Sequence, residues 1–153
     1  MGKRRISREA ALQVAYAREF TEADLPQTLT LVGQLGSHGD EEGLRVADDY
    51  ASAILAAMDE RESEIEDILV DALTGWTLDR LGAPDRAVLR VAVGELLAMP
   101  DVPVRVLINE YIELARRFGD TNSARFVNGV LDRVCQNLGR KDAKTPRKPA
   151  GRS

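Results

Sequence analysis

The fold is decided by residues 102–132, which read VPVRVLINEYIELARRFGDTNSARFVNGVLD. In the first half of this stretch, apolar side chains recur at steps of three and four residues, the spacing of a helix with one apolar face. The period is interrupted at residues 119–122, where Gly119 suits the end of one helix and the polar residues after it suit the cap of the next. It resumes from Val127 to Leu138. The stretch therefore predicts two helices joined by a tight turn.

The dipeptide Asn128-Gly129 tests this interpretation, because such a pair is typical of a hairpin turn. The apolar period continues through it, so we interpret it as helix. A glycine inside a helix costs about 1 kcal/mol relative to alanine. We therefore expect another helix to pack closely against Gly129.

The remainder of the chain shows the same helical period. Ser7 suits the cap of a first helix that continues from Arg8 to about Phe20. Further apolar stripes predict helices at about residues 24–35, 46–58, 65–76 and 85–97, with a short helical turn at 78–81. His38 falls in a polar loop, and Trp76 is expected in the core. The pattern predicts an all-α protein of about seven helices.

Composition excludes several classes of function. With 153 residues, the chain supports one domain, or two small subdomains that share a core. One cysteine and one histidine allow no disulfide framework, zinc set or histidine-based triad, and a lone cysteine suits a reducing cytoplasm. No apolar run approaches the roughly 20 residues that span a bilayer, and the N-terminus lacks the apolar core of a signal peptide.

The net charge of −4 is unevenly distributed. Residues 1–8 carry +4 and residues 140–153 carry +5, which leaves −13 on residues 9–139. Nucleic acid would be attracted to the two ends, and a basic protein to the body. The segment 139–153 is rich in lysine, arginine and proline, which predicts a disordered basic tail.

Several segments, in order and at their spacings, resemble the NusB family of transcription antitermination factors. The resemblance covers residues 1–138, weakly between about 21 and 75. It rests on Arg4-Arg5, Arg8-Glu9-Ala10-Ala11, Gln13-Val14-Ala15-Tyr16, residues 85–92, Glu95-Leu96, Asp101-Val102-Pro103, residues 108–115, Phe118-Gly119 and residues 126–132.

The resemblance implies two packed helical bundles in a single domain of residues 1–138, with subdomains at about 1–75 and 76–138. It also implies a function. The family binds a short single-stranded RNA called boxA together with NusE, a protein of the small ribosomal subunit, within an RNA polymerase antitermination complex. The complex promotes processive synthesis of ribosomal RNA. No catalysis, cofactor, metal or membrane is expected, and the location is the cytoplasm.

The resemblance also assigns site residues. Four basic residues would contact RNA phosphates, Phe126 would stack on a base, and three neighbours would add hydrogen bonds or charge. These RNA-binding residues are Lys3, Arg4, Arg5, Arg8, Asn122, Ser123, Arg125 and Phe126. The surface for NusE maps onto Tyr16, Asp79, Arg80 and Asp85. Each assignment has a structural alternative. The N-terminal basic residues could form a solvated arm without an RNA role, and Phe126 could simply pack in the core. Asp79 and Asp85 could be only a turn residue and an acid at a helix N-terminus.

Two positions depart from the family pattern. Asn122 replaces a frequent acid, which favours RNA, and Gly94 replaces an aromatic residue before Glu95, which predicts a void or a loosened helix. Other functions stay open: a helical adaptor or homodimer without an RNA role, since some relatives pair, and the RNA-binding module of a cytosine-5 rRNA methyltransferase. The latter would need a large catalytic domain that residues 1–153 do not contain.

Overall fold

The structure is a computed structural model that describes residues 3–20 and 41–140. Within these ranges it contains six α-helices, one 3-10 turn and no strand, which confirms the prediction of an all-α protein. The helix expected from residue 24, the loop around His38 and the basic tail lie outside the described residues. The elements are α1 (Lys3–Arg18), α3 (Glu41–Glu60), α4 (Glu62–Ala72), η1 (Leu78–Arg80), α5 (Ala83–Ala98), α6 (Val104–Phe118) and α7 (Thr121–Asn137).

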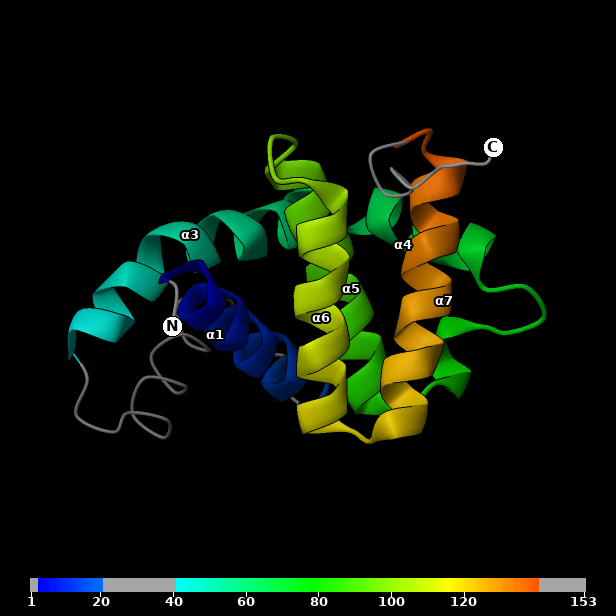
Figure 1. Cartoon of the computed structure of the whole chain (residues 1–153), viewed down its shortest axis with the longest axis horizontal. Coiled ribbons are helices and arrows are strands. Elements are labelled where there is room, and N and C mark those ends of the chain that lie inside the picture. The colour runs from blue at the N-terminus through cyan, green and yellow to red at the C-terminus, as the bar shows by residue number, and fades with distance from the viewer. Residues whose placement is uncertain (1–2, 21–40, 141–153) are drawn as a thin grey trace, which may run out of the picture.

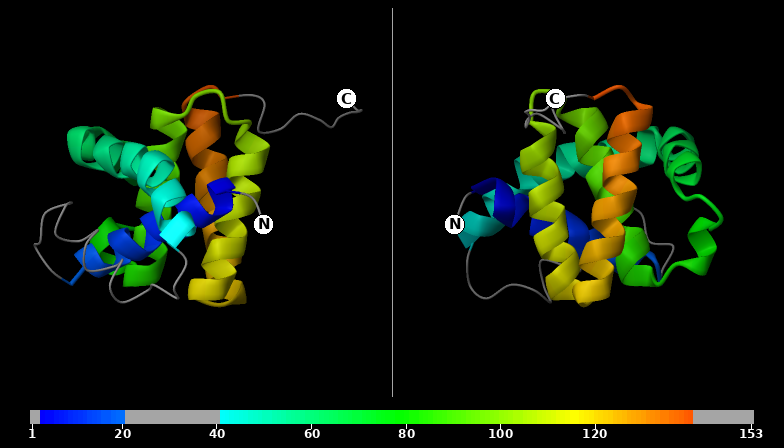
Figure 2. Two further views of the ribbon diagram at one scale, coloured as in Figure 1. Left: turned by 90° about the vertical axis from the view of Figure 1, so that its left-hand side faces the viewer. Right: turned by 45° about the vertical axis from the view of Figure 1, so that its right-hand side comes forward.

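Helix α5 lies at the centre of the molecule and packs against α1, α3, α4, α6 and α7. Figure 1 shows α6 and α7 side by side in front of α5, with α1 and α3 extending to one side. In the right-hand view of Figure 2, α6 lies between the start of α1 and α7. The expected division at about residue 75 stays a prediction, although α4 packs mainly against α5 and α7, on the C-terminal side of that boundary.

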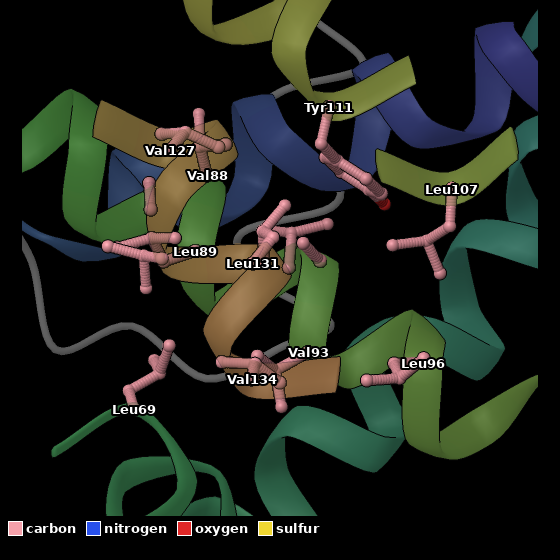
Figure 3. Close-up of a cluster of buried hydrophobic side chains, with 14 of the residues drawn as sticks. Leu69, Val88, Leu89, Val93, Leu96, Leu107, Tyr111, Val127, Leu131 and Val134 are labelled. Atoms are coloured by element: carbon pink, nitrogen blue, oxygen red, sulfur yellow. The ribbon is translucent and has the colours of Figure 1, made fainter. Parts of the chain in front are cut away.

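The central position of α5 explains its sequence, which is apolar around most of its circumference. Val88, Leu89 and Val93 on this helix are at most 1% exposed. Figure 3 shows side chains from α4, α6 and α7 converging on them, among them Leu69 and Leu131. A helix surrounded by others must bury side chains on every face, and it therefore has a weaker amphipathic pattern than its neighbours.

Helix α1 starts earlier than the sequence predicted, at Lys3 rather than at Arg8. Ser7 is therefore not a cap but an interior helical residue that is 0% exposed. Ile6 lies one turn before Ala10, and both pack against the core. This packing against the core, together with the good helix propensity of arginine, extends the helix through residues that were expected to precede it.

The close approach expected at Gly129 is found instead at Gly94. Gly129 is exposed, and a Cβ atom built on it would meet nothing within 4 Å. A Cβ atom on Gly94 would lie 2.8 Å from Cγ of Met58 and 3.5 Å from the carbonyl oxygen of Ile54. Helix α3 thus packs directly over Gly94, and Met58 occupies the space where a void was predicted.

The ends of the last two helices agree with the sequence. The Asp120 side chain accepts a hydrogen bond from the backbone N–H of Ser123 at 2.8 Å and caps α7. Gly139 follows α7 with a φ of +73°, a conformation that favours glycine.

The prediction that Trp76 lies in the core is wrong, because Trp76 lies after the end of α4 and is 51% exposed.

Candidate nucleic-acid interface

The polar centre of the molecule is Glu95 on α5, which is 0% exposed. Arg8 donates to both of its carboxylate oxygens, from Nε at 2.8 and 3.0 Å and from Nη2 at 2.7 Å. The hydroxyl groups of Tyr50 and Tyr111 donate at 2.6 and 2.7 Å. A buried charge is stable only when it is paired and hydrogen-bonded, and these contacts meet both conditions. They join α1, α3 and α6 to α5.

The protonation states of Tyr50, Tyr111 and Arg8 are fixed at neutral pH. Burial and the hydrogen bond to Glu95 raise the pKa of Tyr50 to about 12. Burial, followed by the charge of Glu95, raises the pKa of Tyr111 well above its usual value. For Arg8, burial opposes the charged form, but the hydrogen bonds that Arg8 donates to Glu95 and the negative charge of Glu95 outweigh burial, so the pKa is raised. Both phenols therefore remain donors, and Arg8 remains a cation.

Arg8 does not have the position that the resemblance implied. Its side chain is 5% exposed, and its guanidinium is occupied by Glu95, with Nη1 3.9 Å from an oxygen of Glu110. A phosphate cannot reach a buried guanidinium without opening the helix packing. The geometry therefore gives Arg8 a structural role, and the expectation of a phosphate contact by Arg8 is not supported.

Arg4 and Arg5 have exposed side chains on the first turn and a half of α1. The guanidinium of Arg4 lies 5.0 Å from the ring centroid of Tyr50, in a cation–π contact. Arg5 donates from Nε and Nη2 to the two carboxylate oxygens of Glu110, at 2.9 and 2.7 Å. Lys3 is the first residue of the helix. The start of α1 thus presents two cations in defined positions.

The other expected RNA-binding residues lie at the start of α7. Asn122 and Arg125 are exposed, and Ser123 is partly buried. Phe126 is partly buried and packs against the core, so core packing describes at least part of its role.

Helix α6 connects the two sets of residues. Glu9 on α1 pairs with Arg117 near the end of α6 at 2.8 Å, and α7 begins at Thr121. The start of α1 (dark blue) and α7 (orange) lie on opposite sides of α6 (yellow) in Figure 1 and in the right-hand view of Figure 2. An RNA strand that touches both must therefore cross α6.

The residues expected to meet NusE lie near the opposite end of α1. Asp79 and Arg80 are exposed on η1, Asp85 is partly exposed on α5, and the Tyr16 ring contacts Phe20 edge-on at 5.2 Å. Exposed Trp76 extends the same surface, because the Arg80 guanidinium lies 5.7 Å from its ring centroid.

Arg86 links the end of α1 to η1 within this surface, a role that the sequence did not reveal. It donates from Nε to Glu19 at 2.7 Å, and from Nη1 to the carbonyl oxygens of Leu78 and Leu81 at 3.1 and 2.6 Å. The end of α1 is thereby fixed to η1.

Some classes of site find no support in the part of the chain that the structure describes. No group of three histidine, cysteine or acidic side chains could hold a metal ion there. None of these helices is both long and apolar enough to cross a membrane.

Comparisons with known proteins agree with this architecture. The model of the NusB family matches residues 5–136. A transcription antitermination protein NusB from Sorangium cellulosum is 39% identical over 142 residues, which cover 93% of this chain and 98% of the relative. A solved structure of NusB from T. maritima is 37% identical with a TM-score of 0.73, over 89% of this chain and 92% of that one.

A second solved structure, of antitermination factors NusB and NusE in complex with dsRNA, has the same fold. Its matched chain is 22% identical with a TM-score of 0.75, over 90% of this chain and 98% of that one. The helical order, the turn between α6 and α7, and the matches across most of both chains have one explanation: this protein belongs to the NusB family.

Proposed function

We propose that this protein is a transcription antitermination factor that binds boxA-type single-stranded RNA together with NusE and promotes processive transcription of ribosomal RNA. The family match over residues 5–136 carries the proposal. The curated relatives bear the name of transcription antitermination proteins, and a protein of the same fold was solved with NusE and RNA. As proposed, it acts on nascent RNA in the cytoplasm and catalyses no reaction.

The RNA would contact the start of α1 and the start of α7. Lys3, Arg4 and Arg5 supply charge for phosphates, which gives affinity without selecting sequence. Stacking of a base on the exposed part of Phe126 would add roughly 1–3 kcal/mol. Arg8 acts through Glu95, by holding the first turns of α1 in place.

Selectivity would come from the capping turn of α7. Asn122, Ser123 and Arg125 offer donors and acceptors to base edges, which single-stranded RNA exposes. Ser123 uses its backbone N–H for the cap of α7, so its hydroxyl is the group proposed for RNA.

NusE would bind the surface of Tyr16, Asp79, Arg80 and Asp85. This surface belongs to the body of the chain, which carries −13 without its two basic ends. A basic ribosomal protein would approach it with favourable electrostatics, which raise association rates and select partners. Because α1 is about 24 Å long at 1.5 Å per residue, RNA at its start and NusE at its end can bind at the same time.

The proposal is tested by the affinity for a boxA-type RNA, a scrambled RNA and a duplex of the boxA sequence, with and without NusE. We expect the single strand to bind best and NusE to tighten its binding. Three phosphate contacts should give a slope of about −2 for log K against log salt, at about −0.7 per contact. Equal affinity for the scrambled RNA, with NusE present, would overturn the proposal.

The adaptor alternative predicts a different result. A protein that acts only through protein partners would retain NusE binding and antitermination when Arg4 and Arg5 are both replaced by alanine. Under the proposed function, the same variant keeps NusE binding but binds RNA more weakly and loses antitermination activity. Antitermination by this variant, measured in a reconstituted transcription reaction, separates the two.

A further inference from the structure

Arg5, which the proposed function assigns to a phosphate, is already bound to a carboxylate of the protein. Its Nε and Nη2 donate to the two oxygens of Glu110 in parallel, at 2.9 and 2.7 Å. A guanidinium binds carboxylate and phosphate through the same paired arrangement of donors. Glu110 thus occupies the edge of Arg5 that a phosphate would use.

The position of Glu110 makes this contact more defined than most surface ion pairs. Its side chain is 19% exposed, against 44% for Arg5. One of its oxygens also lies 3.9 Å from Nη1 of the buried Arg8. The hydrogen bond from Arg5, with the charges of Arg5 and Arg8, lowers the pKa of Glu110. The carboxylate is therefore ionised whenever the protein meets RNA at neutral pH.

We propose that Glu110 limits the RNA affinity of the arginine pair at the start of α1, because a phosphate must displace it from Arg5 in order to bind. This inference rests on the proposed function. It makes Glu110 an affinity-determining residue of the RNA surface, although the residue itself is an acid.

The phosphate would use the edge of Nε and Nη2, which presents two parallel donors. Glu110 accepts from both of these donors, so phosphate binding requires that the Arg5–Glu110 pair be broken. Exposed ion pairs change an equilibrium constant by about two- to fivefold, so loss of the Glu110 charge should tighten RNA binding by a factor in that range.

Helix α6 offers a matched control one turn further on. Glu113 has the same charge and also acts on Arg5 through space, but it hydrogen-bonds to Arg116. Glu113→Gln therefore removes a negative charge near Arg5 without breaking the Arg5–Glu110 pair. The difference between Glu110→Gln and Glu113→Gln isolates the effect of displacement.

The experiment measures binding of a boxA-type RNA oligonucleotide to the full chain with NusE, at three salt concentrations. We expect Glu110→Gln to bind about two- to fivefold more tightly than wild type and Glu113→Gln to change affinity less. With Arg5→Ala as background, the additional effect of Glu110→Gln should disappear. Glu110→Asp keeps the charge but shortens the side chain, so it should tighten RNA binding by less than Glu110→Gln. It replaces Glu110→Gln as the test variant if Glu110→Gln does not fold.

Each other outcome overturns the inference in a recognisable way. Weaker binding by Glu110→Gln would mean that Glu110 positions Arg5 for RNA rather than competing with it. Equal changes in RNA affinity for Glu110→Gln and Glu113→Gln would mean that only the net charge near Arg5 matters, and not displacement of Glu110. If RNA binds neither the wild type nor any variant, the proposed function fails as well. If the wild type binds RNA and Glu110→Gln leaves that affinity unchanged, only the inference about Glu110 is overturned.

Discussion

Replacement of Arg8 by alanine should destabilise the protein strongly, because it leaves a buried carboxylate without its cation. In the folded protein, Glu95 is 0% exposed and would retain the hydroxyl groups of Tyr50 and Tyr111 as donors. Removal of one partner of a buried ion pair typically costs about 3–5 kcal/mol. Because the free energy of unfolding of small globular proteins is roughly 5–15 kcal/mol, this loss would be a large fraction of the total stability.

The free energy of unfolding, from urea titrations followed by far-UV circular dichroism, measures this loss. At about 2–4 °C per kcal/mol for a chain of this size, the midpoint of thermal unfolding should fall by roughly 6–20 °C. Arg8→Lys should lose less stability than Arg8→Ala, because the lysine ammonium keeps the positive charge but lacks the paired donors of the guanidinium.

Arg4→Ala is the matched control, since Arg4 lies one turn away on the same helix and is exposed. Its contact with Tyr50 is a surface cation–π interaction, worth about 0.5–1 kcal/mol. If Arg8→Ala cost no more stability than Arg4→Ala, the assignment of Arg8 to the interior would be refuted. Arg8 would then return to the group of phosphate contacts.

Three further predictions concern other parts of the structure. In a phenolate absorbance titration of the folded protein, Tyr50 should ionise at about pH 12, and Tyr50→Phe should remove that step. Because its folded pKa is raised above the unfolded value of about 10, the stability from this group is present below pH 10 and is lost as the pH rises through the folded pKa. Gly129→Ala should stabilise by up to about 1 kcal/mol, whereas Gly94→Ala should destabilise by about 1–3 kcal/mol through the clash with Met58; urea unfolding that gives both the same sign contradicts this. Arg86→Ala should weaken NusE binding without changing the affinity for RNA alone, and calorimetry with each ligand separates the two effects.

Local chemistry made the C-terminal half of the fold predictable. The apolar period located α6 and α7, and the cap by Asp120 follows from residue types within a few positions of each other. The start of α1 was missed because a basic segment carries no apolar stripe. The first turns of the helix are stabilised instead by packing of Ile6 against the core.

The polar cluster could not be predicted, since its members are distant in sequence. Arg8 lies 87 positions before Glu95, and Tyr50 lies 45 positions before it. A partial signal was present, because Glu95 interrupts an apolar run that a buried helix would otherwise continue. Composition alone gives no means of pairing such an acid with one arginine among many.

Trp76 was misassigned for a related reason. The helical period extrapolates to residue 76, but α4 ends at Ala72 and residues 74–77 are exposed. A period predicts a face only as long as the helix continues. The exposed ring is therefore a property of the helix end, which apolar spacing does not determine.

The central claim is that the exposed arginines at the start of α1 bind RNA phosphates. It is tested most directly by the salt dependence of boxA-type RNA binding, with NusE present, for wild type and for the Arg4→Ala/Arg5→Ala double variant. Loss of two phosphate contacts should make the slope of log K against log salt shallower by about 1.4. An unchanged slope, in a variant that unfolds like wild type, would contradict the claim.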